Sequence, residues 1–209
     1  MMLFNHFIAG LIISFVGTLP PGMISLTVIN TTVKKSVRQG ILVAAGASFL
    51  EFFQAFAAVF FSRFLTHSEV IKTIINYSAA PVFAGLGLFF LFRKVKHTSP
   101  EKAYASSSSS FLKGMLISSF NLFVIPFWIF WSTYLANKNW IELQLLPSLV
   151  LTIGIITGTF LALLLYIWMG RLLKNKVDRI GLWIDNVVGM AFLAFAVYHT
   201  IRLAAEVLS

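Results

Sequence analysis

The chain has 209 residues, of which 58% are hydrophobic and 11% are charged. Soluble domains carry about 25% charged residues, so this composition excludes an ordinary soluble domain and indicates a surface that mostly faces lipid. Cysteine is absent from the sequence, which excludes disulfides and thiolate metal sites. The formal net charge of +9 does not indicate a nucleic-acid partner, because the sequence contains no basic folded domain or nucleic-acid-binding motif.

Six apolar stretches follow one another, each long enough to cross about 30 Å of hydrocarbon. In lipid, backbone polar groups must be satisfied within the protein, and these stretches are too long for barrel strands. We therefore predict an all-α, polytopic membrane protein of six transmembrane helices in a single domain, residues 1–209. The stretches are about Leu3–Val33, Ile41–Phe61, Ile71–Phe92, Phe111–Leu135, Leu143–Met169 and Leu182–Ile201.

The first stretch is interrupted by Pro20, Pro21 and Gly22. Proline donates no backbone hydrogen bond and displaces the carbonyl four residues before it, so the carbonyls of Val16 and Gly17 are predicted to be free. A second half-helix is then expected to begin near Gly22 with its first N–H groups unpaired. A helix N-terminus attracts anions, and this one is a candidate to bind a carboxylate. The alternative is a structural kink whose backbone groups are satisfied by neighbouring helices.

The fourth stretch carries a comparable interruption, where Asn121 is followed by Pro126. Pro126 is predicted to free the carbonyl of Leu122. The amide of Asn121, about one turn earlier, suits either the freed backbone or a substrate, and both alternatives stay open. Breaks at corresponding places in two stretches indicate a binding site more strongly than one break does.

Glu51 is the only charged residue within Ile41–Phe61. A carboxylate near a bilayer centre costs roughly 2.5–3.5 kcal/mol on insertion scales, so it is kept where it faces protein or water. On a helix, Glu51 shares one side with Ser48 and Gln54 by i, i+3 spacing. This side is predicted to face the bundle, where Glu51 accepts a proton, binds an ammonium group, or does both. The alternative is a neutral, hydrogen-bonded glutamic acid with a structural role. Alanines complete the predicted side: Ala44, Ala47, Ala55 and Ala58.

Basic residues are concentrated in three of the connections between the stretches. The connections after the first, third and fifth stretches hold 12 of the 16 Lys and Arg residues, and the opposite side of the membrane holds 4. Cytoplasmic loops carry such an excess of basic residues. We therefore predict a multi-pass protein of the cytoplasmic membrane whose N- and C-termini both lie outside.

The sequence also repeats weakly. Two halves of three helices each must have opposite orientations in the membrane, and inverted repeats of this kind are common in secondary transporters. We predict repeats at about 1–92 and 111–209, joined by a basic, serine-rich loop at 93–110. The matching positions are Phe7, Gly10 and Ser14 with Phe111, Gly114 and Ser118, and Gly85 with Gly189, at a separation of 104 residues, and Gly46 and Arg63 with Gly154 and Arg171 at 108.

Two further polar residues are expected at the membrane interface. His199 lies near the outer end of the sixth stretch, and Asp185 lies near its cytoplasmic start. Asp185 is expected to be a partner of the basic residues just before it. His199 is expected to be interfacial and not part of a proton relay.

Several of these segments resemble the LysE/RhtB amino-acid exporters. That family has a Pro-Gly-Pro motif in its first span, a basic turn, and a glycine-rich second span with an acidic residue where Glu51 stands. Here the first motif is Pro-Pro-Gly, the adjacent Asn-Pro of the fourth span is split, and the acidic residue is Glu instead of Asp. The resemblance implies export of amino acids or related small solutes, driven by the proton-motive force. It is carried by Leu19–Gly22, Lys34–Arg38, Gln39–Ile41, Gly46–Glu51 and Asp178–Gly189.

Other functions stay open as alternatives. These are an inorganic-ion exporter of the same fold, a membrane scaffold subunit without transport, and an intramembrane enzyme. The enzyme is disfavoured because no HExxH motif or pair of intramembrane carboxylates is found. The expected partners are a small-molecule substrate, protons and the lipid bilayer. No cofactor or metal is expected, and a homo-oligomer is left open.

Overall fold

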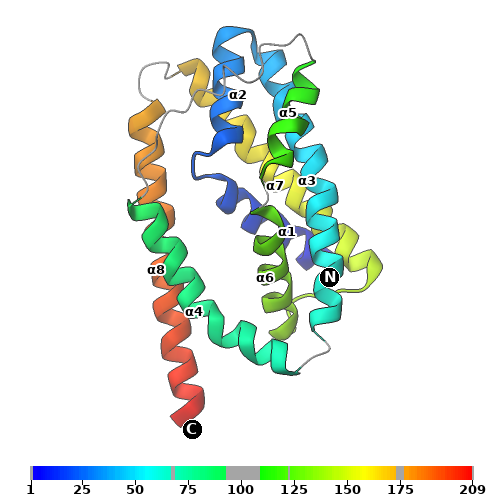
Figure 1. Ribbon diagram of the computed structural model, residues 1–209, viewed down its shortest axis with the longest axis vertical. Helices are drawn as coiled ribbons and strands as arrows, with labels where there is room; N and C mark the ends of the chain where they lie inside the picture. Colours follow the sequence, from blue (N-terminus) through cyan, green and yellow to red (C-terminus); the bar gives the residue numbers. More distant parts are fainter. Residues whose placement is uncertain (1, 67–68, 93–108, 122, 173–176, 209) are drawn as a thin grey trace.

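The computed structural model describes residues 2–66, 69–92, 109–121, 123–172 and 177–208. These residues form eight α-helices and no strand. Figure 1 shows the helices as an elongated bundle. They are α1 (Met2–Thr18), α2 (Met23–Lys34), α3 (Val37–Leu65), α4 (Glu69–Phe92), α5 (Ser110–Ser119), α6 (Val124–Asn137), α7 (Leu145–Leu172) and α8 (Val177–Leu208).

Each of the six apolar stretches overlaps with one or two of these helices. Within the described residues, α3 and α7 are each long and apolar enough to cross a membrane alone. The pairs α1–α2 and α5–α6 each qualify as one bent span, with bends of 74° and 68°. The apolar parts of α4 and α8, Tyr77–Phe89 and Gly189–Ala205, are shorter. By length and composition the described chain therefore has two to four candidate spans, which agrees with a helical membrane protein.

Helices α1 and α7 cross at glycines. A Cβ atom added to Gly154 would lie 2.2 Å from the carbonyl oxygen of Phe7, and one added to Gly10 would lie 2.3 Å from that of Leu151. Small residues let two backbones approach closely in membrane helix pairs. Because backbone atoms are the neighbours on both sides, this crossing needs glycine on each helix.

A second crossing of the same kind joins α3 to α5. A Cβ atom on Gly46 would lie 2.0 Å from the carbonyl oxygen of Phe111, and one on Gly114 would lie 2.0 Å from that of Val43. The four glycines of the two crossings are those that the repeat pairs in sequence, Gly10 with Gly114 and Gly46 with Gly154. The equivalent helices of the two halves are therefore packed in the same manner.

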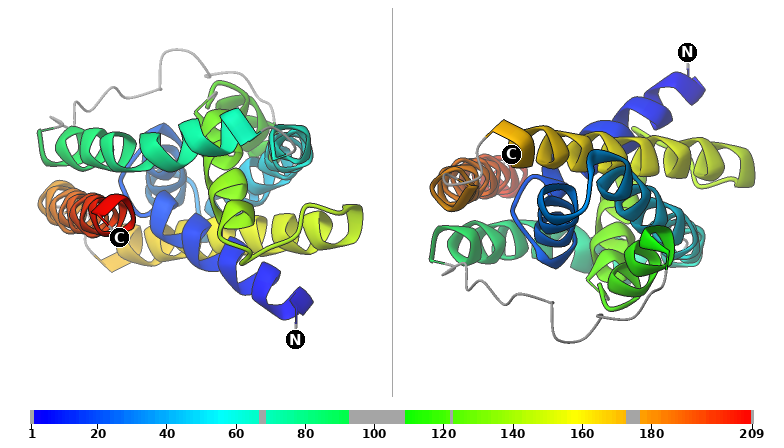
Figure 2. Two further views of the ribbon diagram at one scale, coloured as in Figure 1. Left: turned by 90° about the horizontal axis from the view of Figure 1, so that it is seen from below. Right: turned by 90° about the horizontal axis from the view of Figure 1, so that it is seen from above.

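Helices α4 and α8 lie side by side at one edge of the bundle, and α3 and α5 lie at the opposite edge (Figure 2). Gly87 and Gly189 face each other, because a Cβ on either would lie 2.9 Å from the other's carbonyl oxygen. The repeat pairs Gly189 with Gly85 in sequence, but Gly85 has nothing within 4 Å of its Cβ position. The α4–α8 contact therefore involves Gly87 and not Gly85, the glycine that the repeat pairs with Gly189.

The break between α1 and α2 is more fully hydrogen-bonded than predicted. The N–H of Leu19 donates to the carbonyl of Val16 over 3.2 Å, so the prediction of a free Val16 carbonyl is wrong. The N–H of Gly22 donates to Ser25 Oγ over 2.7 Å, so this amide is not unpaired either. The Tyr166 hydroxyl on α7 donates to the carbonyl of Leu19. A short-range turn thus replaces the lost bond to the Val16 carbonyl, and two side chains bond other backbone groups of the break.

The break between α5 and α6 includes Asn121, as predicted. Helix α5 ends at Ser119 and α6 begins at Val124, and the N–H of Asn121 donates to the Ser118 carbonyl over 2.9 Å. Pro126 is the third residue of α6, where an N–H has no partner within its own helix and proline is tolerated. A proline at this place therefore agrees with a helix that begins just before it. The carbonyl of Leu122, predicted to be freed, lies outside the described residues.

The side chain of His199 is buried within the protein, at 1% exposed, which does not test its predicted place at the membrane interface. Its ring packs against Tyr134, with 5.6 Å between the ring centroids. The side chain of Asp185 and residues 93–108 of the basic loop lie outside the described residues. The structure therefore does not test the expectations for them.

Candidate functional site

Helix α3 carries Glu51 on its buried face. Glu51 is 8% exposed and Ser48 is 6% exposed, whereas Phe49 and Phe53 are 48% and 53% exposed. Gln54 is half-buried. The prediction that the small and polar side of α3 faces protein is confirmed, and aromatic rings cover much of the outer side. The predicted alanines on the inner side are all buried: Ala44, Ala47, Ala55 and Ala58.

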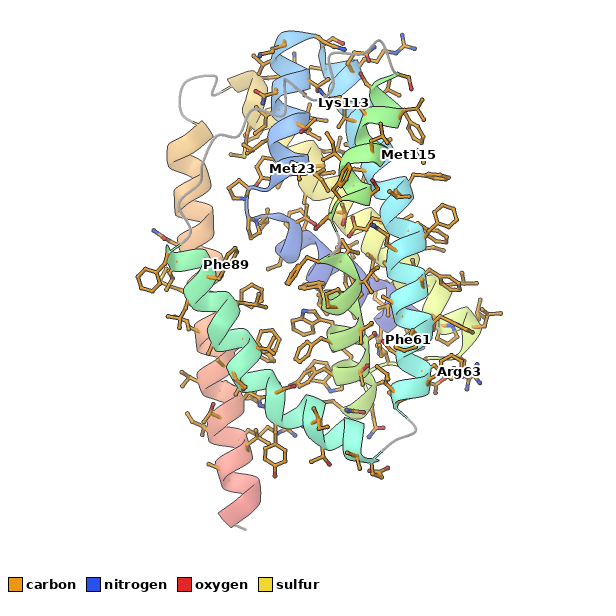
Figure 3. The ribbon with its side chains drawn as sticks, in the orientation of Figure 1. Met23, Phe61, Arg63, Phe89, Lys113 and Met115 are labelled. Atoms are coloured by element: carbon orange, nitrogen blue, oxygen red, sulfur yellow. The ribbon has the colours of Figure 1, made fainter. Side chains whose placement is uncertain are left out.

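Glu51 lines a cavity of about 320 Å³ between the two helix breaks. Pro20 and Gly22 contribute from the first break, and Asn121 contributes from the second. Figure 3 places Met23, another lining residue, at the start of α2. The volume lies at the lower end of the range for small-molecule sites, about 300–1,000 Å³. The broken helices therefore open a space of ligand size beside the carboxylate.

Four of the eight predicted site residues line this cavity, and four do not. Pro21, Ser48, Gln54 and Pro126 are absent from its lining. Gln54 Nε2 donates to the backbone carbonyl of Ser118 on α5 over 3.4 Å, so Gln54 joins two helices. The Ser48 hydroxyl is buried without a hydrogen-bond partner. The structure thus brings only half of the predicted site residues to the cavity.

Glu51 also lines a second, smaller cavity of about 90 Å³. Gly17, Thr18, Glu51 and Asn121 line both cavities. The remaining lining of the smaller cavity comes mainly from aromatic and aliphatic side chains of α4, α6 and α8, among them Phe127. Glu51 is therefore one of four residues that the two cavities share.

Hydroxyl groups and an indole line the two cavities together with Glu51. Thr159 on α7 lines the larger cavity and Trp128 on α6 lines the smaller one. Thr159 Oγ1 lies 2.6 Å from Ser14 Oγ and 3.4 Å from Thr18 Oγ1, both on α1. These hydroxyl groups join α7 to α1 at the cavities that Glu51 lines. The smaller cavity is lined by three of these residues: Ser14, Thr18 and Trp128.

Sequence reasoning missed Thr159, although one signal points to it. Thr159 follows Glu51 by 108 residues, which is the separation between Gly46 and Gly154. In the predicted repeat, Thr159 therefore corresponds to Glu51. Serine and threonine are common in membrane helices, so only this separation distinguishes Thr159 from the others.

Glu51 is the only charged or histidine side chain among the described residues that line the two cavities. Basic residues lie instead toward the ends of the bundle, as Lys113 and Arg63 show at opposite ends of Figure 3. In the part of the chain that the structure describes, no group of three His, Cys, Asp or Glu side chains could hold a metal ion. The site combines one carboxylate, neutral polar groups and apolar walls.

Comparison with known proteins supplies one finding. Residues 15–202 match the family model of the LysE type translocator. The matched segment contains both helix breaks, Glu51 and Thr159. Comparisons with curated proteins and with solved structures give no match.

Proposed function

Because the chain belongs to the LysE type translocator family, a family of membrane transporters, we propose that it exports amino acids or related small solutes across the cytoplasmic membrane. Glu51 is proposed to couple this export to proton entry. The observation that carries the proposal is that Glu51 lines two cavities, the larger of which is also lined by residues of both helix breaks. In secondary transporters, broken helices and a midplane site recur together.

The chemistry of the larger cavity favours a zwitterion without a further charge. Glu51 offers the negative group that an ammonium needs. The first amides of α2, those of Met23 and Ile24, have no carbonyl within their own helix and favour a carboxylate. The rest of the wall includes three apolar side chains, those of Ile117, Phe120 and Leu163. A neutral amino acid with an apolar side chain fits these groups, whereas lysine or glutamate would bring a charge without a partner.

Coupling follows from the presence of a single carboxyl group. An ionised Glu51 binds an ammonium group, and a protonated Glu51 does not. Proton and substrate therefore compete for one group, so that arrival of a proton from outside favours release of the solute. Since no second charged side chain lines the cavities within the described residues, nothing else in the site performs this exchange.

We also propose the six-helix inverted-repeat architecture, with repeats at about 1–92 and 111–209 and both termini outside. The matching glycine crossings, α1 with α7 and α5 with α3, support the repeat. The excess of basic residues on one side supports the orientation. Gly22 and Pro20 at the first break, Asn121 at the second, and Glu51 between them form the proposed substrate site. The inorganic-ion alternative gains no support from the neutral polar groups around the single carboxylate.

The test is transport in proteoliposomes with an imposed pH gradient. Radiolabelled leucine, lysine and glutamate are the probes. Wild-type protein is expected to move leucine against its own gradient and to prefer it over the other two. Glu51→Gln keeps the shape and removes the charge, so gradient-driven transport should be lost while exchange of leucine down its gradient survives. Glu51→Asp should do less harm, and Glu69→Gln, at an exposed carboxylate, serves as the control.

Two results would contradict the proposal. Full gradient-driven transport by Glu51→Gln would remove Glu51 from coupling. A wild-type protein that moves none of the three amino acids would refute the proposed substrate class. If Glu51→Gln fails to reach the membrane, Glu51→Asp supplies the same comparison with the charge kept and its position changed.

A further inference from the structure

We propose that Ser118 is a positioning residue, whose hydroxyl group donates a hydrogen bond to the Glu51 carboxyl group in a second form of the transporter. In this second form, called the exchanged form below, each half of the inverted repeat has taken up the conformation of the other. In the form that the structure shows, the equivalent bond joins Ser14 to Thr159. The inference rests on the proposed function and on the proposed repeat, because it assumes that the two halves exchange conformations during transport.

The two glycine crossings have the same register. A Cβ atom on Gly10 of α1 would lie 3.0 Å from the amide nitrogen of Ile155 on α7. A Cβ atom on Gly114 of α5 would lie 2.9 Å from the amide nitrogen of Ala47 on α3. Ile155 follows Ala47 by 108 residues, and Gly114 follows Gly10 by 104. The two halves therefore agree residue by residue where their helices touch.

Each crossing is followed, four residues later on both helices, by a pair of polar residues. On α1 and α7 the pair is Ser14 and Thr159, whose hydroxyl oxygens are 2.6 Å apart. On α5 and α3 the pair is Ser118 and Glu51. Gln54, three residues after Glu51, donates to the backbone carbonyl of Ser118 over 3.4 Å, so this end of α5 stays beside α3. The repeat therefore predicts a bond between Ser118 and Glu51.

The hydroxyl group of Ser118 does not make this bond in the form that the structure shows. Its side chain is 1% exposed, and its oxygen has no hydrogen-bond partner among the described residues. The large majority of buried polar side chains have a partner, so a second form that supplies one accounts for this serine. A carboxyl group has acceptor capacity whether it is ionised or protonated. Glu51 is therefore a suitable acceptor throughout the transport cycle.

Two neighbours of Ser118 also carry buried oxygen atoms without a partner in the described structure, Ser48 Oγ and Gln54 Oε1. The repeat predicts no bond for either of them. The residues that follow them by 108 positions are Ile156 and Ala162, which have no polar side-chain atom. Among these three residues only Ser118 has a hydrogen-bonded equivalent in the other half.

The helices that carry the two serines end differently. Helix α1 continues for four residues after Ser14, to Thr18, whereas α5 ends at Ser119, one residue after Ser118. Alternating access in inverted-repeat transporters moves one repeat against the other around the site. In the exchanged form, α5 is therefore expected to have the conformation that α1 has here. The Ser118 bond should then form, and the Ser14 bond should break.

The two cavities differ in the same sense. Pro20 and Met23 line the larger cavity, and the residues that follow them by 104 positions, Val124 and Phe127, line the smaller one. The cavities are therefore equivalent in the repeat, but their volumes are about 320 and 90 Å³. An exchange of conformations should close the larger cavity and open the smaller one.

The test measures the balance between the two forms without measuring transport. A single cysteine reporter is introduced as Met23→Cys in the larger cavity or as Phe127→Cys in the smaller one, in a chain that has no other cysteine. The purified protein is treated in detergent with a small, water-soluble methanethiosulfonate reagent, which reaches both sides. The readout is the ratio of the two labelling rates.

The two serines are expected to act on this ratio in opposite directions. Ser118→Ala removes the bond of the exchanged form, so labelling at position 23 should gain relative to labelling at position 127. Ser14→Ala removes the bond of the form shown here and should have the reverse effect. Each substitution should change the ratio about fivefold or more, the effect of about one hydrogen bond. The double variant should return toward the wild type.

Three controls separate this role from packing. Ser118→Thr keeps the hydroxyl and should resemble the wild type. Thr152→Val should also resemble it, because Thr152 is buried on α7 and bonds the Ser148 carbonyl within its own helix. In a Glu51→Ala background, Ser118→Ala should have no effect while Ser14→Ala keeps its effect, because only Ser118 acts through Glu51.

Three results would overturn the inference. They are a shift in the same direction, or no shift, for Ser118→Ala and Ser14→Ala; a Ser118→Thr variant that behaves like Ser118→Ala; and an effect of Ser118→Ala that persists in the Glu51→Ala background. Failure of the proposed function is distinguishable, because it appears in proteoliposomes as normal gradient-driven transport by Glu51→Gln and leaves the labelling ratios unchanged.

Discussion

Replacement of Gly154 by alanine should destabilise the protein, because the crossing of α1 and α7 leaves no room for a methyl group. The added Cβ would lie 2.2 Å from the carbonyl oxygen of Phe7 and 2.9 Å from its carbonyl carbon. Both neighbours are backbone atoms, so no side-chain rotation relieves the contact. The two helices must separate by roughly 0.8 Å merely to bring the oxygen contact to 3.0 Å.

Overpacking of this kind costs about 1–3 kcal/mol. Alanine has an intrinsic advantage of about 1 kcal/mol over glycine in a helix, which offsets part of the cost. Gly85→Ala separates these two contributions, because nothing lies within 4 Å of its Cβ position. That variant should be neutral or more stable than the wild type.

The measurement is the midpoint of thermal unfolding of the purified protein in detergent. For a chain of this length, each kcal/mol corresponds to roughly 2–4 °C, so the midpoint of Gly154→Ala should fall by several degrees. Gly85→Ala should remain level or rise. Equal midpoints for Gly154→Ala and the wild type would refute the close approach of α1 and α7. A fall in both variants would show that the effect arises from alanine itself and not from the crossing.

Two further predictions concern the first break and the orientation. Joint replacement of Pro20 and Pro21 by alanine should let α1 and α2 join into one helix, so the variant should insert but transport little; undiminished leucine transport would show that the break is only a kink. Single cysteines at Ser36 and Asn139, both exposed, can be introduced without background because the chain has none. With both termini outside, an impermeant thiol reagent added to intact cells should label position 139 and not position 36, and the reverse pattern would contradict the orientation.

The helices and the inner face of α3 could be predicted because lipid imposes a length and a polarity rule on the sequence. A carboxylate such as Glu51 must face protein in a membrane, and helical spacing then places its neighbours. The second break could be predicted from Asn121 and Pro126, because proline is tolerated in the first turn of a helix and not in its interior. Helix α6 accordingly begins two residues before Pro126.

The hydrogen bonds of the site depended on contacts between distant segments. The hydroxyl of Ser25 accepts a hydrogen bond from the amide of Gly22. In the sequence nothing distinguishes Ser25 from other serines near a helix start. The contact of Ser14 with Thr159 joins residues 145 positions apart. No local pattern specifies such a pair, and only the glycine crossing of α1 and α7 brings the two hydroxyl groups together.

The correspondence of Glu51 with Thr159 bears on the balance between inward- and outward-facing forms. In the proposed inverted repeat, two identical halves could exchange conformations at no difference in free energy, because a two-fold axis in the membrane plane would relate the two forms. A carboxyl group on one half and a hydroxyl on the other remove that degeneracy. The empty transporter should therefore have a preferred resting orientation, and a ligand or proton that binds the two forms unequally shifts the balance between them.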